Sequence, residues 1–156
     1  MTVDPLVYVV SLGADSEPPW STLSWRQMVH LRKVYFHPPG KRQFPRDPVG
    51  YLGFRYEGHL QALAAIEQVV TVPCRSELSR FVPEIDGEAC RLAYDQGARV
   101  PHFVYILKDV VTPHHIIPAG PKIHRARKVW AFLSLLQQCE TISEAETLTR
   151  ERLEKG

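Results

Sequence analysis

VGYLGFRYEGHLQALAAIEQVVTV, residues Val49 to Val72, is the stretch of sequence that predicts the fold. In residues 51–56 successive side chains alternate between two faces, as they do in a strand. Glu57-Gly58 then supplies a two-residue turn of the type that joins antiparallel strands. The second arm, Leu60 to Val72, ends in β-branched residues, so we predict strand throughout, with room for a bulge. A helix in the first half of that arm is the alternative, because Ala and Leu favour one.

The length and composition are those of one globular domain. The chain has 156 residues, of which 44% are hydrophobic and 23% charged, so we expect a single domain over residues 1–156. The N-terminus has no basic segment before an apolar core, and no apolar run is long enough to cross a bilayer. This predicts a cytoplasmic protein without a membrane partner. Three cysteines far apart in the sequence predict reduced thiols rather than a disulfide framework.

Other elements are predicted from periodicity and from turn residues. In chain order they are a buried strand at 6–12 (LVYVVSL), a helix at 24–33 with Ser21 and Ser24 as candidate N-caps, a proline-rich basic loop at 37–48, a helix at 88–96 after an Asp86-Gly87 turn, a strand at 102–107, and short extended pieces at 110–111 and 116–117.

The C-terminal part is predicted to be helical. The apolar spacing from Val129 to about Gln138 indicates a helix whose N-terminal end is the basic cluster 122–128, so that the helix dipole and the cations would act together on an anion. Ser143 and Glu146 stand in the relation of a capping box. They predict a closing helix over 143–156, and its mostly charged sequence favours fraying.

Charge is distributed unevenly along the chain. Residues 18–46 and 110–139 contain no acid, although they hold ten of the 19 Lys and Arg residues. If the two segments meet in the fold, one face is strongly positive and attracts phosphate chains by counterion release. The alternative is that each segment is a separately solvated loop. Aromatic residues lie within or beside the first basic segment and the hairpin, where their faces could stack on bases.

A resemblance adds to this interpretation. Over roughly residues 6–130, the order of the predicted elements resembles that of the PUA-like superfamily of small β-barrels, which includes EVE, ASCH, YTH and SRA-type domains. The elements are, in order, LVYVVSL, SWRQMVHL, a basic connection, GYLGFRYEG, HFVYIL and a closing basic element. The resemblance is strongest at the hairpin, which is similar to the EVE segment. It implies an α+β fold with a bent, largely antiparallel sheet or small barrel and two or three peripheral helices. It also implies binding of RNA or DNA, in several members by enclosing a modified base.

We therefore predict a nucleic-acid-binding domain that reads a modified or flipped base, with no cofactor. Trp25, Phe54 and Tyr56 are assigned to base stacking by their position in the resemblance, and core packing is the alternative for each aromatic residue. The predicted contacts to phosphate or base come from Arg32, Lys33, Lys41, Arg42, Arg55, Arg125, Arg127 and Lys128.

Two other functions stay open. A nuclease or other hydrolase acting on nucleic acid could use His37, His59 or His124 as a base, although the sequence contains no catalytic motif. A protein-interaction module is the third alternative. His114-His115 and His124 with Cys139 match no metal-ligand spacing, so we expect no metal site.

Overall fold

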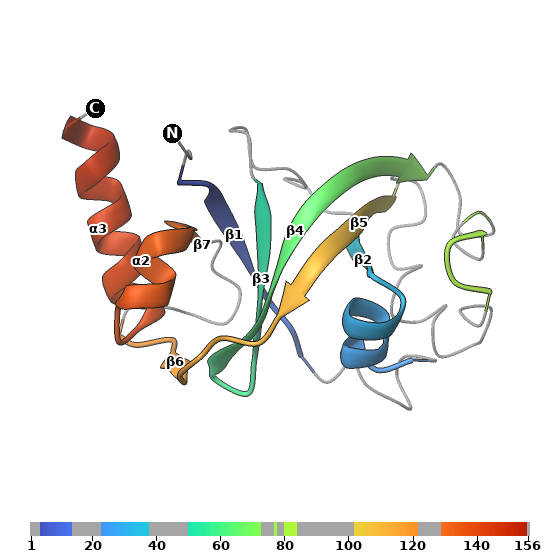
Figure 1. Ribbon diagram of the computed structural model, residues 1–156, viewed down its shortest axis with the longest axis horizontal. Helices are drawn as coiled ribbons and strands as arrows, with labels where there is room; N and C mark the ends of the chain where they lie inside the picture. Colours follow the sequence, from blue (N-terminus) through green and yellow to red (C-terminus); the bar gives the residue numbers. More distant parts are fainter. Residues whose placement is uncertain are drawn as a thin grey trace. The chain divides into compact units, whose positions relative to one another are not determined.

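The computed structural model describes residues 4–13, 23–37, 50–72, 77, 80–83, 102–121 and 129–155. Hydrogen bonds join the strands in the order β2-β5-β4-β3-β1-β7, with β6 paired to β4. The elements (Figure 1) are β1 Leu6–Ser11, the π-helical turn η2 Gln27–Leu31, β2 Val34–His37, β3 Tyr51–Tyr56, β4 His59–Val72, β5 His102–Val111, β6 Ile117–Pro118, β7 Val129–Phe132, α2 Leu133–Gln138 and α3 Ile142–Lys155.

The sheet is mixed and open. β1 and β3 run parallel, whereas the pairs β1–β7, β2–β5, β3–β4 and β4–β6 are antiparallel. In the part of the chain that the structure describes, the strand order ends at β2 and β7, so the strands do not close into a barrel. The protein is therefore an α+β protein with a largely antiparallel sheet, as predicted.

The chain divides into two compact units. Unit 1 comprises residues 1–12, 46–65 and 111–156, and unit 2 comprises residues 13–45 and 66–110. The long strand β4 contributes its N-terminal half to unit 1 and its C-terminal half to unit 2.

The predicted hairpin of β3 and β4 is confirmed. Its turn residues Glu57 and Gly58 both have positive φ, 54° and 85°, which is the backbone of the tight turns that match strand twist. β4 is strand along its whole length, so the helical alternative is wrong. The register shifts between Phe54 and Arg55, which leaves Gln61 as an extra residue on β4. This irregularity is the bulge that the sequence left room for.

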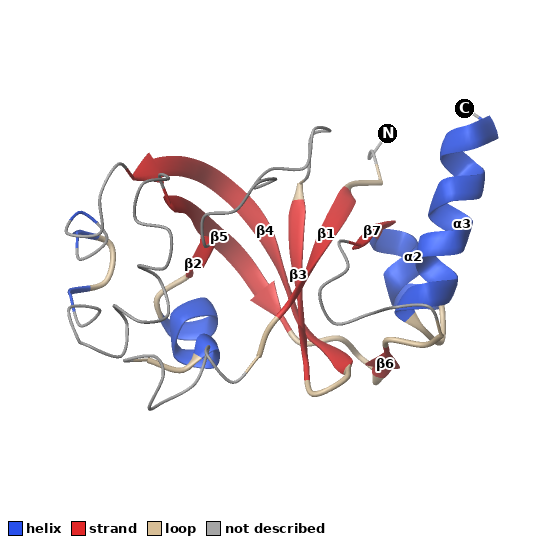
Figure 2. Ribbon diagram, turned by 180° about the vertical axis from the view of Figure 1, so that it is seen from behind, coloured by secondary structure: helices blue, strands red, loops and turns tan. Residues whose placement is uncertain are grey.

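Unit 1 has its own hydrophobic core. β1 is buried from Val7 to Val10, as expected of an apolar strand with neighbours on both sides, and it lies between β3 and β7. Figure 2 shows β1, β3 and β7 from behind, with α2 and α3 on the side of β7. The core cluster comprises Val7, Val9, Leu60, Leu63, Ile117, Val129, Ala131, Leu135, Leu136, Cys139, Ile142 and Ala145.

The helix predicted from Val129 begins only at Leu133. Residues 129–132 form strand β7 instead, with Val129 and Ala131 buried and the two residues between and after them half-buried. This alternation fits a strand, and pairing with β1 satisfies the backbone of β7. The basic cluster 122–128 lies outside the described residues. It precedes a strand, so the predicted joint action of a helix dipole and these cations is also wrong.

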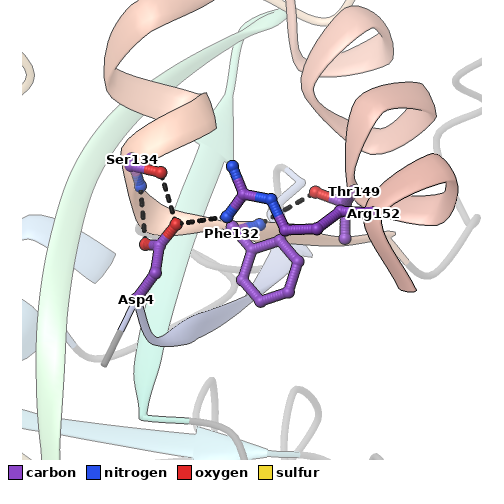
Figure 3. Close-up of polar contacts among 5 residues, drawn as sticks. All are labelled: Asp4, Phe132, Ser134, Thr149 and Arg152. Carbon is purple, nitrogen blue, oxygen red and sulfur yellow. Dashed lines mark hydrogen bonds and ion pairs between the residues drawn. The ribbon is translucent and has the colours of Figure 1, made fainter. Parts of the chain in front are cut away.

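A polar network ties the N-terminus to both C-terminal helices (Figure 3). The backbone N–H of Ser134 donates to Asp4 Oδ1 over 3.1 Å, and the Ser134 hydroxyl donates to Asp4 Oδ2. The same carboxylate oxygen lies 2.7 Å from the Arg152 guanidinium of α3. Because no side chain within α2 caps its first turn, Asp4 acts as a cap supplied from the other end of the chain.

α3 is also held by packing and by its own cap. Ile142, Ala145, Glu146 and Thr149 are buried, which is the spacing of one helix face. The Thr149 hydroxyl accepts the backbone N–H of Phe132 over 2.9 Å, and the Arg152 guanidinium lies 4.6 Å from the Phe132 ring centroid. These contacts fix the helix against β7.

The N-cap of α3 differs from the predicted one. Thr141 Oγ1 accepts the backbone N–H of Glu144 over 3.0 Å, whereas Ser143 lies inside the helix. Glu146 is buried and forms an ion pair with Arg150. The capping box of Ser143 and Glu146 is therefore wrong. The helix starts earlier because Ile142, which is fully buried, is drawn into the packed face.

Unit 2 is built from η2, β2, β5 and the second half of β4. β2 pairs antiparallel with β5, from Val34 opposite Ile106 to His37 opposite Phe103. Its core consists of Met28, Val34, Phe36, Val72, Val82 and Val104. The predicted loop at 37–48 begins at His37, which the structure places in β2. The rest of that loop and the predicted turn and helix at 86–96 lie outside the described residues. No helix among the described residues is long and apolar enough to cross a membrane.

Candidate nucleic-acid interface

A short helical turn in unit 2 carries the first candidate site. Ser24 begins it as predicted: its hydroxyl accepts the backbone N–H of Gln27 over 3.2 Å, and Gln27 Oε1 accepts the backbone N–H of Ser24 over 2.9 Å. This reciprocal pair is a capping box with Gln in the second position. The backbone N–H of Arg32 then reaches back to the Gln27 carbonyl over 3.1 Å, which makes the turn wider than an α-helix.

The turn ends at Lys33, whose φ is 60°. A non-glycine residue in this region costs energy and occurs often at functional sites. The Lys33 ammonium donates to the His30 carbonyl over 3.0 Å. The Lys33 carbonyl accepts the backbone N–H of Leu107 over 2.8 Å. The backbone of Lys33 is thus fixed by β5, and its charge lies at the end of the turn.

Cations flank this turn at both of its ends. Arg26, Arg32 and Lys33 are exposed, His30 is half-buried beside them, and the first turn of η2 holds no acid. The Arg26 guanidinium lies 4.8 Å from the Trp25 ring centroid, an arrangement that holds a cation over an aromatic face. We call Arg26, His30, Arg32 and Lys33 the basic turn.

His30 is affected by these neighbours. Burial, and then the charges of Lys33 and Arg26, lower the pKa of His30 below its ordinary value. The ring is therefore neutral at pH 7, and it lies 6.1 Å from the Trp25 ring, centroid to centroid. An anion bound at the basic turn would oppose the effect of the two cations on this histidine.

Arg55 and Tyr56 lie at the hairpin in unit 1. Arg55 is only 7% exposed, and its Nη2 donates to the Ser11 hydroxyl over 2.9 Å. The two residues are register partners on β3 and β1. Burial lowers the pKa of Arg55, but an arginine stays charged in proteins. Tyr56 is half-buried, and its carbonyl accepts the Gln61 side-chain amide over 2.6 Å.

The other predicted residues are distributed as follows. Trp25 is 4% exposed and Phe54 is 0% exposed, so the faces of both rings are covered by protein. Trp25, Arg32 and Lys33 belong to unit 2, whereas Phe54, Arg55 and Tyr56 belong to unit 1. The predicted cations that lie outside the described residues are Lys41, Arg42, Arg125, Arg127 and Lys128.

A pocket in unit 1 was not predicted from the sequence. It has a volume of about 240 Å³ and lies where the chain leaves β5 for β6. It is lined by Leu63, Val111, Thr112, Pro113, His114, His115, Ile117 and Gln137. We call it the β5–β6 pocket. The pair His114-His115 beside a proline was the only signal in the sequence, and adjacent histidines alone do not indicate a pocket.

Of the three histidines proposed as catalytic bases, the structure describes only the side chain of His59. His59 is half-buried on β4 opposite Pro118, the side chain of His37 is not described, and His124 lies outside the described residues. Among the residues that the structure describes, no group of three or more His, Cys, Asp or Glu side chains could hold a metal ion.

Known proteins are similar to this chain in fold. The crystal structure of ASCH from Zymomonas mobilis aligns with a TM-score of 0.51 and 15% identity over 81% of this chain and 87% of that chain. A serine-to-alanine variant of the same protein aligns with a TM-score of 0.50 and 18% identity, over 97% of this chain and 99% of that chain. A tyrosine-to-phenylalanine variant aligns with a TM-score of 0.50 and 17% identity, over 81% of this chain and 89% of that chain.

No protein-family model matches the chain, and no curated protein matches it. At identities of 15–18% the structural likeness establishes the fold alone. It agrees with the layout of strands and helices that the sequence resemblance implied. This chain therefore has a fold similar to that of ASCH from Zymomonas mobilis.

Proposed function

We propose that this protein binds nucleic acid and that the basic turn contacts its phosphates. The observation that carries the proposal is the exposure of Arg26, Arg32 and Lys33 at the two ends of η2, within residues 23–37, which include no acid. Cations that meet a phosphate chain release its condensed counterions. The guanidinium groups can also form paired, charge-assisted hydrogen bonds with phosphate oxygens.

The fold supports the same function. PUA-like domains, which this chain resembles in the order of its elements, bind RNA or DNA, and the fold of this protein is ASCH-like. The fold alone does not assign a function. The proposal therefore rests on the basic turn, with the fold as its second support.

Further phosphate contacts are proposed for the cations outside the described residues. Lys41 and Arg42 follow the basic turn in the same acid-free segment, and the second acid-free segment holds the others. These are Arg125, Arg127 and Lys128. Their role would be to extend the positive surface along the strand of nucleic acid.

Base recognition is the finer part of the proposal. Tyr56 is partly exposed, so its ring could stack on a modified or flipped base. Arg55 precedes it on β3, is only 7% exposed and donates to Ser11, so its guanidinium would have to leave this buried position to contact a base or a phosphate. Trp25 and Phe54 would need to leave their buried positions to stack. A comparison of modified with unmodified oligonucleotides, on the wild type and Tyr56→Ala, tests this part.

The experiment that tests the proposal is a binding titration with labelled single-stranded RNA, single-stranded DNA and duplex DNA at low salt. The test variant is Arg32→Gln with Lys33→Asn. Asn tolerates positive φ, so the charge of Lys33 is removed without added backbone strain. We expect the double variant to bind at least about tenfold more weakly than the wild type on whichever nucleic acid binds.

Lys155→Gln is the matched control. It removes an exposed cation at the end of α3 in unit 1, outside the basic turn. Its affinity should equal that of the wild type. If no oligonucleotide binds the wild type, the proposal is wrong; if the control loses as much affinity as the double variant, binding does not depend on the basic turn.

A further inference from the structure

We infer that the β5–β6 pocket binds an uncharged planar heterocycle of nucleobase size. The inference rests on the proposed function, because a bound nucleic acid would supply such a ring. The pocket lies entirely within unit 1. Its size, its lining and its exposed apolar rim each support this ligand class.

The volume limits the ligand to a small one. At about 240 Å³ the pocket is smaller than sites for drug-sized molecules, which begin near 300 Å³. A single ring system with little attached to it is therefore the natural occupant, rather than a peptide or a cofactor of several rings.

The lining selects against charge. Among the described residues that line it, none carries a carboxylate, an ammonium or a guanidinium. Its apolar base includes Leu63 and Ile117, which are 1% and 0% exposed. A charged ligand would lose its hydration here without gaining an opposite charge, whereas the face of an uncharged ring would be covered by apolar groups.

The pocket also contains polar groups that can form hydrogen bonds with the edge of a ring. The Gln137 amide offers both donors and an acceptor. His115 Nε2 lies 3.3 Å from the Cys139 carbonyl, which holds the imidazole in place. When Nε2 donates this bond, the neutral ring keeps its lone pair on Nδ1 as an acceptor. Few polar groups on an apolar base are typical of a site that orients a small ligand.

The mouth of the pocket exposes apolar surface to water. Val111 lines the pocket and is 50% exposed. Exposed apolar surface at a concave site often marks a binding site. Imidazole rings such as those of His114 and His115 also stack on planar bases.

The test uses the full chain and four nucleosides: adenosine, guanosine, cytidine and uridine. Binding is measured by saturation-transfer NMR and by shifts of the histidine ring signals. We expect at least one nucleoside to bind with a Kd of roughly 0.1–1 mM, as befits a small ligand with few polar contacts. Its 5′-monophosphate should bind no more tightly at the pocket, because neither Lys nor Arg is among the described lining residues.

Two variants change the pocket, and one is a matched control. Gln137→Ala removes the amide, and Thr112→Trp fills the mouth from an exposed position. Each should weaken nucleoside binding by about tenfold. Gln138→Ala changes an exposed neighbour on α2 that does not line the pocket, so its binding should be unchanged. Failure of all four nucleosides to bind the wild type, or equal binding by Thr112→Trp, overturns the inference.

Oligonucleotide binding is measured on the same variants, to distinguish a base in a bound strand from a free nucleoside and to test the proposed function separately. If the base comes from a bound strand, Gln137→Ala also weakens oligonucleotide binding; if the source is a free nucleoside, it does not. Oligonucleotide binding without any nucleoside binding rejects the pocket and leaves the proposed function intact. Nucleoside binding without oligonucleotide binding rejects the proposed function and leaves the pocket as a small-molecule site.

Discussion

Gly120 is a residue that the fold requires to be glycine. Its φ is 82°, and a Cβ there would lie 2.9 Å from Thr141 Cβ and 3.0 Å from Ser143 Cβ. The Ala119 carbonyl on one side of it accepts the backbone N–H of Ser143. We expect Gly120→Asn to destabilise the protein by about 2–3 kcal/mol, measured by urea unfolding, because the side chain clashes with the start of α3.

Gly58→Asn is the matched control for this prediction. Gly58 has nearly the same φ, 85°, but nothing lies within 4 Å of the place that a Cβ would take there. Asn tolerates positive φ, so the cost should stay below about 1 kcal/mol. Equal losses in the two variants would show that the backbone angle, rather than contact with α3, makes Gly120 necessary.

We expect His30 to make nucleic-acid binding depend on pH. Burial, Lys33 and Arg26 lower its pKa in the free protein, and bound phosphate would raise the pKa towards its ordinary value or above. Binding would then take up a proton, so affinity should rise as the pH falls through the pKa of the complex. Each unit of upward shift corresponds to about a tenfold gain. Titrations between pH 5 and pH 8 check this, and His30→Gln should remove the dependence.

At the scale of elements, Asp4 joins β1, α2 and α3. Burial raises the pKa of Asp4, but hydrogen bonds from Ser134, together with the hydrogen bond and charge of Arg152, outweigh burial, and the net pKa is lowered below 3.8. A carboxylate with a depressed folded pKa stabilises the fold above its unfolded pKa. The contribution is lost as the pH falls through the folded value.

Asp4→Asn therefore has a defined effect on stability. We expect it to lower the free energy of unfolding at pH 7 by about 1 kcal/mol, because the charged cap of α2 and the ion pair to α3 are lost. The difference between variant and wild type should shrink below pH 3.8, where the wild-type carboxylate becomes protonated. A difference that stays constant with pH would contradict the role given to the charge of Asp4.

The cap of α3 gives a second test at this scale. Thr141→Ala should cost about 1 kcal/mol of stability in thermal or urea unfolding, because the Thr141 hydroxyl accepts the Glu144 N–H. Ser143→Ala should cost less, since Ser143 lies within the helix. The opposite order would favour the capping box that the sequence predicted.

The elements also show what the sequence can predict. The hairpin was predictable because Glu57-Gly58 and the alternation of residues 51–56 are local signals. The strand at residues 129–132 was not, because VWAF also fits the apolar spacing of a helix, and only pairing with β1 decides between the two. Thr141 was missed as a cap for the same reason: the burial of Ile142 is a tertiary contact that no local pattern contains.

At the scale of the whole molecule, the sequence predicted an α+β fold with a largely antiparallel sheet, and it predicted less of the site. The sequence placed Arg32 and Lys33 in an acid-free basic segment, and the structure exposes both just after η2. Trp25 and Phe54 are aromatic residues whose burial the sequence could not reveal, because core and stacking aromatics have the same composition. The β5–β6 pocket depends on residues from three separate segments, and sequence order does not bring these together.

The measurement that tests the proposed function most directly is the salt dependence of oligonucleotide binding. For the wild type, the logarithm of the binding constant should fall linearly with the logarithm of salt concentration, by about 0.9 per phosphate contact on duplex DNA and about 0.7 on a single strand. Arg32→Gln with Lys33→Asn should reduce this slope by about 1.4–1.8, the value for two contacts. A wild-type affinity that does not change with salt, or a slope that the double variant leaves unchanged, would contradict phosphate binding by the basic turn.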